Sequence, residues 1–146
     1  MQIYTDLESI IADGIIEERE IANCVELMQQ EFVECIVGQK LTCTYPVLDI
    51  YLNPRKTMQG GFISAAFDNT FGSLIYFSTG RLDMATINMH VNYHRPIFQN
   101  DKLTVTVYVK LLGKTIINLE GEAYNTDKKL IASANGNFIL LNDKSE

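Results

Sequence analysis

The chain has 146 residues, of which 47% are hydrophobic and 21% are charged, as is typical of one globular domain with a sizeable core. The formal net charge of −6 at pH 7 argues against a nucleic-acid partner, because such a surface needs clustered Lys and Arg. There is no membrane-length apolar run and no signal-peptide pattern, and the three cysteines lack CxxC spacing. We therefore expect a cytoplasmic protein with free thiols and no membrane partner.

The first forty residues predict helices. The order of residues from Thr5 to Glu8 has the form of a capping box, in which Thr5 is the N-cap. Over residues 15–37, apolar side chains recur at spacings of three and four, and Gly38 is a suitable helix stop. Two interpretations of this second helix remain open. It either packs by one face on the core, or it forms a lid or a surface for a partner.

The middle of the chain predicts a strand and then a long, largely buried helix. Residues 41–52 are rich in Thr, Tyr, Val and Ile, and Asn53 with Pro54 ends that strand. The helix is expected to begin near Gln59 and to end near Gly80. One carboxylate, Asp68, lies in the middle of its apolar run, and a carboxylate there is costly unless it is paired, solvated or used.

The last third predicts four antiparallel strands over residues 82–96, 101–112, 115–124 and 130–141, because apolar and polar residues alternate there. Small residues would let this sheet curl closely around the helix; they are Gly121, Ala132, Ala134 and Gly136. One strand, a buried helix and four meandering strands indicate an α+β fold. We expect one domain over residues 1–146, with a helical extension over 1–40 and a core over 41–142.

The central helix also predicts a site. Small residues form a stripe along one side of it, and Asp68 is the acid in that stripe; the other members are Gly61, Ser64, Ala65 and Gly72. The first-turn amides have no intrahelical partner and favour an oxygen that gains negative charge. This geometry suits addition to a carbonyl, with Asp68 as general base or nucleophile. The alternative is structural, with glycines that permit close packing and an Asp68 bonded to nearby backbone.

Several spaced elements together resemble the hotdog-fold acyl-CoA thioesterases of the PaaI-like kind. That family has a loop Asn, then His-Gly-Gly at the start of the central helix, and then an acid seven residues after the second Gly. A strand follows, with Ser or Thr near its start and Tyr-x-x-Pro at its end. The corresponding residues here are Asn53, Gln59-Gly60-Gly61, Asp68, Thr86 and Tyr93-His94-Arg95-Pro96.

The resemblance implies hydrolysis of an acyl-CoA thioester without a cofactor or metal. It also implies a homodimer joined through the strand after the helix, with sites at the interface, and often a dimer of dimers. In the implied roles, Asp68 is the base or nucleophile, and Gly60 polarises the carbonyl together with Gly61. Asn53 orients water or the leaving group, and Thr86 supports the acid. From the residues themselves, we expect Ser64 of the stripe to contact the substrate, and we favour Arg95 among the basic residues for the coenzyme A phosphates.

One position departs from the family pattern. Gln59 stands where the family has His, and glutamine cannot carry a proton near neutral pH, so a non-catalytic acyl-CoA or fatty-acyl binding protein is the alternative function. A hydratase is a third and weaker interpretation, because neither His lies near the helix.

Thr86 lies in sequence among the polar residues of its strand, which should face away from the helix. A β-bulge, or a position at the dimer interface, would explain how Thr86 still reaches Asp68. His90 and His94 point to one side of a strand but have no acidic or Cys partner for a metal site.

Overall fold

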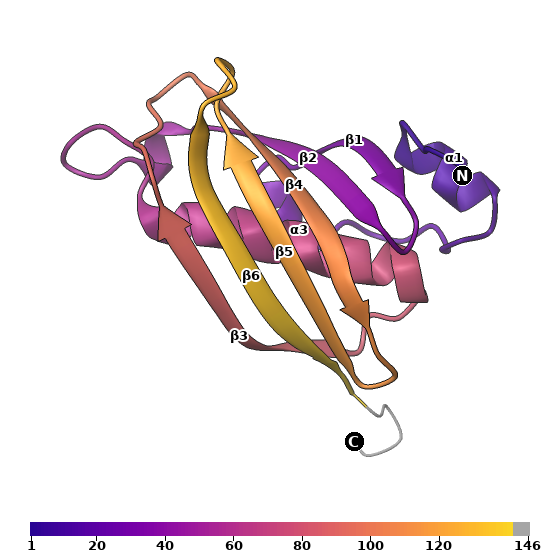
Figure 1. The fold of residues 1–146 in the computed structure, drawn as a ribbon. Helices are drawn as coiled ribbons and strands as arrows, with labels where there is room; N and C mark the ends of the chain where they lie inside the picture. The colour runs from indigo at the N-terminus through magenta and orange to yellow at the C-terminus, as the bar shows by residue number, and fades with distance from the viewer. Residues whose placement is uncertain (142–146) are drawn as a thin grey trace.

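A computed structural model describes residues 1–141, so the predicted core boundary at residue 142 lies outside it. The elements are α1 (Leu7–Ala12), α2 (Asn23–Leu27), β1 (Glu31–Ile36), β2 (Lys40–Pro46), a 3-10 turn η1 (Asp49–Tyr51), α3 (Gly60–Thr79), β3 (Met84–Tyr93), β4 (Lys102–Leu112), β5 (Ile116–Tyr124) and β6 (Leu130–Leu140). A six-stranded antiparallel sheet curves around α3, which covers one of its faces (Figure 1). The predicted α+β architecture is confirmed.

The strands follow the order β1-β2-β4-β5-β6-β3 across the sheet. The expected meander of the last four strands is therefore wrong, because β3 pairs with β6 at the far edge and not with β4. Residues between β3 and β4 cross the end of the sheet, where Met58 donates its amide to the carbonyl of Ile97. As an edge strand β3 is mostly exposed, and Ile87 and Tyr93 each keep 51% of their surface accessible.

The predicted helix over residues 15–37 is wrong. Only α2 is helical there, and β1 pairs with β2, with Gly38 in the turn between them at φ +80°. Burial in β1 alternates along the strand, and Cys35 is fully buried and bridged to Tyr4. Sheet pairing thus overrides an apolar spacing that also fits a helix.

Three of the predicted helix ends can be compared with the structure. The N-cap of α1 is Asp6 and not Thr5, and its carboxylate accepts a hydrogen bond of 2.7 Å from the amide of Ser9. This bond lowers the pKa of Asp6. Helix α3 begins and ends where expected, with Gln59 as N-cap and a left-handed Gly80 as C-cap.

The core lies between α3 and the inner face of the sheet. Phe67 and Phe71 are fully buried on the helix, opposite Val107 and Leu119 of the sheet. A Cβ on Gly121 would lie 2.9 Å from Cγ1 of Val107 and 3.2 Å from the ring of Phe67, so this small residue is what lets the sheet approach the helix, as expected. In residues 1–141 no helix has the length and apolar character needed to cross a membrane.

Candidate active site

A β-bulge turns Thr86 toward the helix. In the β3–β6 pairing, Thr86 lies opposite Phe138 and Asn88 lies opposite Asn137, so Ile87 is an extra residue. Phe138 is buried on the helix side of the sheet, in contact with Phe71. Thr86 therefore faces α3, although its parity in the sequence groups it with outward-facing residues. The bulge, one of the two explanations that the sequence left open, resolves the conflict.

Asp68 and Thr86 meet beside the open edge of the sheet. The Thr86 hydroxyl donates to Oδ1 of Asp68 over 3.1 Å, and both residues are exposed in the single chain. A hydroxyl bond of this kind fixes the orientation of the carboxylate without neutralising its charge. The acid on the stripe thus has a defined position and remains open to a reactant.

The start of α3 leaves its first amides available. Gln59 is the N-cap without a side-chain capping bond, and its carbonyl accepts from the amides of Phe62 and Ile63. The amides of Gly60 and Gly61 precede these bonds and belong to the donors that a helix cannot satisfy internally. Oε1 of Gln59 lies over Gly61, 3.0 Å from where a Cβ on that glycine would stand.

Tyr93 contacts the same helix start, and the sequence reasoning gave it no role. Its hydroxyl donates to the carbonyl of Gly60 over 2.9 Å and lies 2.6 Å from Oγ of Ser64. A Cβ on Gly60 would stand 3.0 Å from Cζ of Tyr93. The Tyr-x-x-Pro pattern at the end of β3 was the available signal, because it places one aromatic hydroxyl at a fixed point of the strand.

In a single chain, the side chains of Asn53 and Arg95 form no hydrogen bond with Asp68, Thr86 or the first turn of α3. Oδ1 of Asn53 accepts from the amides of Arg55 and Thr57, and Nδ2 donates to Oγ1 of Thr57, so the side chain holds its own loop. The guanidinium of Arg95 donates to the carbonyl of Leu130 over 2.9 Å. Asn53 thus shapes the loop before the helix, and Arg95 lies at the start of β6.

The acid and the amides are too far apart to hold one carbonyl within one chain. Asp68 follows Gly61 by seven residues, and a helix rises about 1.5 Å per residue, so the two are separated by roughly 10 Å along the axis. They project from nearly the same side of the helix. A carbonyl that accepts a hydrogen bond from the Gly61 amide is therefore out of reach of Asp68 of the same chain.

The family model for the thioesterase superfamily matches residues 56–132, slightly more than half of the chain. This chain belongs to the thioesterase superfamily. The matched residues run from the loop before α3 to β6 and include Gln59, Gly60, Asp68, Thr86 and Tyr93.

Solved structures give this thioesterase-superfamily chain a hotdog fold. The Escherichia coli PaaI protein from the phenylacetic acid degradation operon superposes with a TM-score of 0.75 at 20% identity, covering 83% of this chain and 86% of its own. A Streptococcus mutans protein bound to acetyl-CoA superposes with a TM-score of 0.72 at 25% identity, covering 86% of this chain and 94% of its own. The expected PaaI-like hotdog fold is thereby confirmed.

A Saccharolobus solfataricus protein that carries the name of an esterase is 30% identical to this chain over 87 residues, which are 60% of this chain. The match spans 61% of the length of that curated relative. This relative therefore resembles the chain over about three fifths of either length.

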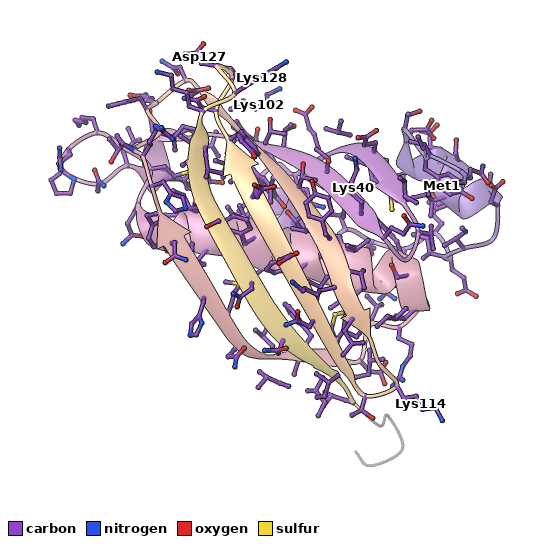
Figure 2. All side chains as sticks on the ribbon, in the orientation of Figure 1. Met1, Lys40, Lys102, Lys114, Asp127 and Lys128 are labelled. Carbon is purple, nitrogen blue, oxygen red and sulfur yellow. The ribbon has the colours of Figure 1, made fainter. Side chains whose placement is uncertain are left out.

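Three lysines of this superfamily member lie at opposite ends of the sheet. Lys102 and Lys128 lie at one end and Lys114 at the other (Figure 2). Arg95 bonds to Leu130, the first residue of β6, and so lies at the same end as Lys128. Tyr93 ties the helix start to that end as well. Within one chain, Lys114 is therefore remote from the helix start.

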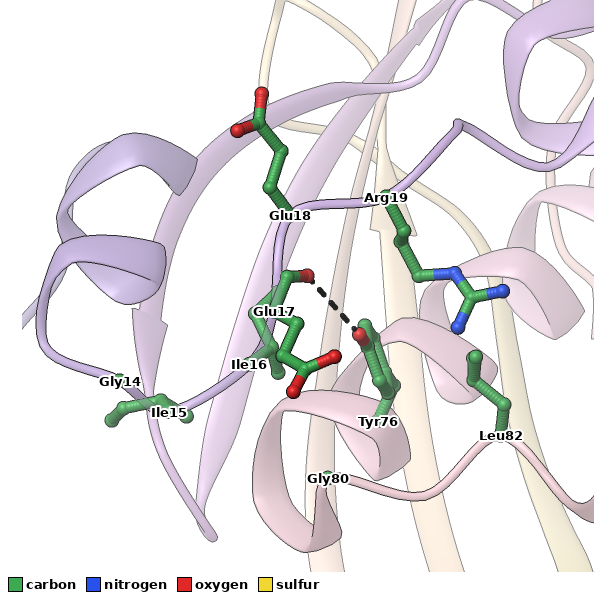
Figure 3. A pocket seen from close by; sticks show the side chains of 9 residues that line it. All are labelled: Gly14, Ile15, Ile16, Glu17, Glu18, Arg19, Tyr76, Gly80 and Leu82. Atoms are coloured by element: carbon green, nitrogen blue, oxygen red, sulfur yellow. Dashed lines mark hydrogen bonds between the residues drawn. The ribbon is translucent and has the colours of Figure 1, made fainter.

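Two surface hollows lie away from the helix start. One of about 430 Å³ lies between residues 14–19 and the C-terminal end of α3, where Tyr76 donates to the carbonyl of Glu17 and lies between Glu17 and Arg19 (Figure 3). Another of about 420 Å³ lies on the outer face of the sheet beside Glu120 and Glu122. Neither is lined by Asp68 or by the first turn of α3.

The imidazole of His94 forms a hydrogen bond of 2.9 Å with Oγ of Ser133. Within residues 1–141, no group of three or more His, Cys, Asp or Glu side chains could hold a metal ion.

Proposed function

We propose that this protein is an acyl-CoA thioesterase that hydrolyses R–CO–S–CoA to the free acid and coenzyme A. The observation that carries the proposal is the carboxylate of Asp68, held by Thr86 on the same side of α3 as the uncapped amides of Gly60 and Gly61. Membership of the thioesterase superfamily supports it, as does the 25% identical S. mutans protein that binds acetyl-CoA.

The proposed site is shared by two copies of the chain. The roughly 10 Å between Asp68 and the Gly61 amide along the helix is too long for one carbonyl. The exposed edge of β3 is where a second copy would pair to bring its own helix start to Asp68. The homodimer through β3 is therefore part of the proposal, because the site is incomplete without it.

In the proposed reaction, Asp68 takes a proton from water and the resulting hydroxide adds to the thioester carbonyl. The oxygen of that carbonyl gains negative charge, which the amides of Gly60 and Gly61 from the partner copy stabilise. The C–S bond then breaks and the coenzyme A thiolate leaves and takes up a proton. Direct attack by Asp68, which passes through an anhydride that water then opens, uses the same geometry.

In this proposal, coenzyme A lies at the end of the sheet that carries the helix start. Arg95 and Lys128 lie at that end, and Lys129 precedes β6 there. Their charges suit the phosphates of coenzyme A, whereas Lys114 lies at the other end. We assign Arg95 to the phosphates.

Gln59 favours a second candidate function, a protein that binds acyl-CoA without hydrolysing it. Its amide can donate a hydrogen bond to the thioester from its place over Gly61, but it cannot transfer a proton as the family His can. Thioesterase activity is the better supported candidate, since Asp68 and Thr86 supply an oriented base on their own.

Release of free thiol from a panel of acyl-CoAs tests the function. We expect Asp68→Asn to lower kcat by roughly 10²- to 10⁴-fold, the usual contribution of a general base, while Glu20→Gln, an exposed carboxylate far along the chain, keeps full activity. Equal rates for wild type and Asp68→Asn would remove the assigned role. Tight acyl-CoA binding without turnover, joined by turnover in Gln59→His, would favour the binding protein.

The shared site is tested by mixing two inactive variants, Asp68→Asn and Gly60→Ala. In a mixed dimer with shared sites, one site carries both changes and the other carries neither, so activity returns. If each site lay within one chain, every site would carry one change and the mixture would stay inactive.

A further inference from the structure

One N-terminal segment runs along α3 beside the proposed base. Residues 17–27 contain α2 and lie outside the stretch that the thioesterase family model matches. The hydroxyl of Tyr76 donates to the carbonyl of Glu17 (Figure 3). Farther along the segment, the carbonyl of Cys24 accepts from Nδ2 of Asn69 over 3.3 Å. Asn69 and Tyr76 are about two helical turns apart, so the segment follows one side of α3.

This segment and β3 lie on opposite sides of Asp68. Asn69, which bonds to the segment, is rotated from Asp68 by about 100° around the helix axis. Ser64 is rotated by about 40° in the other direction, and its hydroxyl bonds to Tyr93 of β3. Residues 17–27 are therefore on the side of Asp68 that is away from the edge proposed for the second copy.

The part of the segment nearest to Asn69 presents apolar side chains to solvent. We call this part, residues 21–27, the strap. Ile21 and Leu27 keep 59% and 62% of their surface exposed, and each is three residues from Cys24, whose carbonyl meets Asn69. One such side chain is ordinary on a surface, but here two flank a contact next to the acid. A hydrocarbon chain bound there would remove both from water.

The charge of the segment narrows the class of occupant. Residues 17–27 hold four glutamates and one arginine, a net charge of −3. Such a segment repels the phosphates of coenzyme A, which suit the basic end of the sheet instead. An uncharged hydrocarbon chain escapes this repulsion and gains free energy by covering Ile21 and Leu27.

We propose that the strap is the wall against which the acyl chain lies, and that the preferred substrates are thioesters of long, uncharged hydrocarbon acyl groups. The inference rests on the proposed thioesterase function and deepens it by naming the acyl class. The acyl chain leaves the carbonyl at Asp68 and passes over Asn69 to Ile21 and Leu27 of the same chain. An acetyl group ends beside the carbonyl and does not reach the strap.

Cys24 reports contact with the strap without turnover. Burial raises the pKa of Cys35 to about 11 and that of Cys43 to about 12, whereas Cys24 is exposed, so a thiol reagent at pH 8 modifies Cys24 in the folded protein. The probes are S-acetonyl-coenzyme A, a ketone that cannot be hydrolysed, and its homologue of lauroyl chain length.

Each ketone is added at ten times its own Kd, where about one site in eleven is empty. We expect the long ketone to slow the modification of Cys24 by about tenfold, because only the empty sites react. The short ketone should leave the rate within about twofold of that of the free protein, because it fills the site without reaching the strap.

Hydrolysis then tests the wall by chain length. Leu27→Gln replaces an apolar side chain by a polar one of similar length. We expect kcat/KM for lauroyl-CoA to fall by about tenfold, the lower end of what one hydrophobic contact gives in a pocket, while the value for acetyl-CoA stays within about twofold. Leu111→Gln in β4 is the matched control, because Leu111 is 61% exposed. It should keep both values.

The outcomes separate this inference from the proposed function. Equal rates of Cys24 modification with and without the long ketone overturn the acyl wall, whether or not the wild type hydrolyses thioesters. A wild type that prefers acetyl-CoA to lauroyl-CoA overturns it too, as do equal losses at both chain lengths in Leu27→Gln, while thioesterase activity stands. A wild type that hydrolyses no acyl-CoA overturns the proposed function, and protection of Cys24 by the long ketone alone would still support the wall.

Discussion

The two ends of helix α3 differ in how they are capped. At the C-terminal end, Gly80 adopts φ +71° and its amide bonds to the carbonyl of Tyr76 over 2.7 Å, while the Ser78 hydroxyl accepts from the amide of Gly38. At the N-terminal end, Gln59 makes no side-chain capping bond. From other segments, the carbonyl of Tyr51 accepts from the amide of Gln59, and Tyr93 bonds to the Gly60 carbonyl and the Ser64 hydroxyl. These contacts do not use the amides of Gly60 and Gly61.

This difference indicates what each end is for. A capping side chain at a helix start ordinarily contributes about 1 kcal/mol of stability, and α3 has no such side chain at the end where Gly60 and Gly61 lie. Without a cap, the first amides can donate to a ligand oxygen, whereas the capped C-terminal end stabilises the fold. Changes at the first end should therefore alter rate, and changes at the second should alter stability.

Among changes at the two ends of α3, the largest expected effect comes from Gly60→Ala. The added methyl must displace the Tyr93 ring, and misplacement of this kind at a reacting centre costs on the order of 10²-fold in kcat. Gly72→Ala is the matched control in the same helix, because a Cβ there meets nothing within 4 Å. It should keep full activity and gain up to about 1 kcal/mol of stability from helix propensity. Similar rates for the two variants would contradict a special role for the helix start.

A smaller effect is expected at the other end from Gly80→Ala. An alanine in the left-handed conformation costs roughly 1–2 kcal/mol, so the free energy of unfolding should fall by that amount in urea titrations. The kcat of the folded protein should stay within about twofold of wild type. A loss of kcat at unchanged stability would contradict the assignment of catalysis to the N-terminal end of α3 and of stability to its C-terminal end.

The smallest effect concerns the cysteines of the segments that cover α3. Burial raises the pKa of the Cys35 thiol to about 11 and that of Cys43 to about 12, whereas Cys24 is exposed. A thiol reagent at pH 8 should modify one cysteine in the native protein and three after unfolding. Because both buried pKa values are raised, their contribution to stability is complete below pH 9 and is lost as the pH rises through 11 and 12. Rapid modification of Cys35 would contradict the pairing of β1 with β2.

The sequence predicted the centre of the molecule better than its margins. Helix α3 follows from a long apolar run that ends at a glycine suited to the left-handed conformation. The segment before Gly38 was misassigned because five apolar side chains at spacings of three and four fit a helix as well as a strand. Only the backbone bonds of β1 to β2 distinguish the two.

The candidate site also has a part that the local sequence predicts and a part that it does not. The residue types and spacing of Gln59, Gly60, Gly61 and Asp68 are local, because one helix carries them, and a helix fixes their relative positions by its pitch alone. That part of the site, together with the hotdog fold and the thioesterase family, was determined by the sequence.

Tertiary structure decided the partners of those residues. Alternation along a strand assumes an unbroken pleat, and the bulge at Ile87 reverses the face of Thr86, which is how its hydroxyl reaches Asp68. The pairing of β3 with β6 places Tyr93 against Gly60. Both contacts join residues that are 18 or more positions apart, and such contacts depend on strand order and register, which local periodicity does not encode.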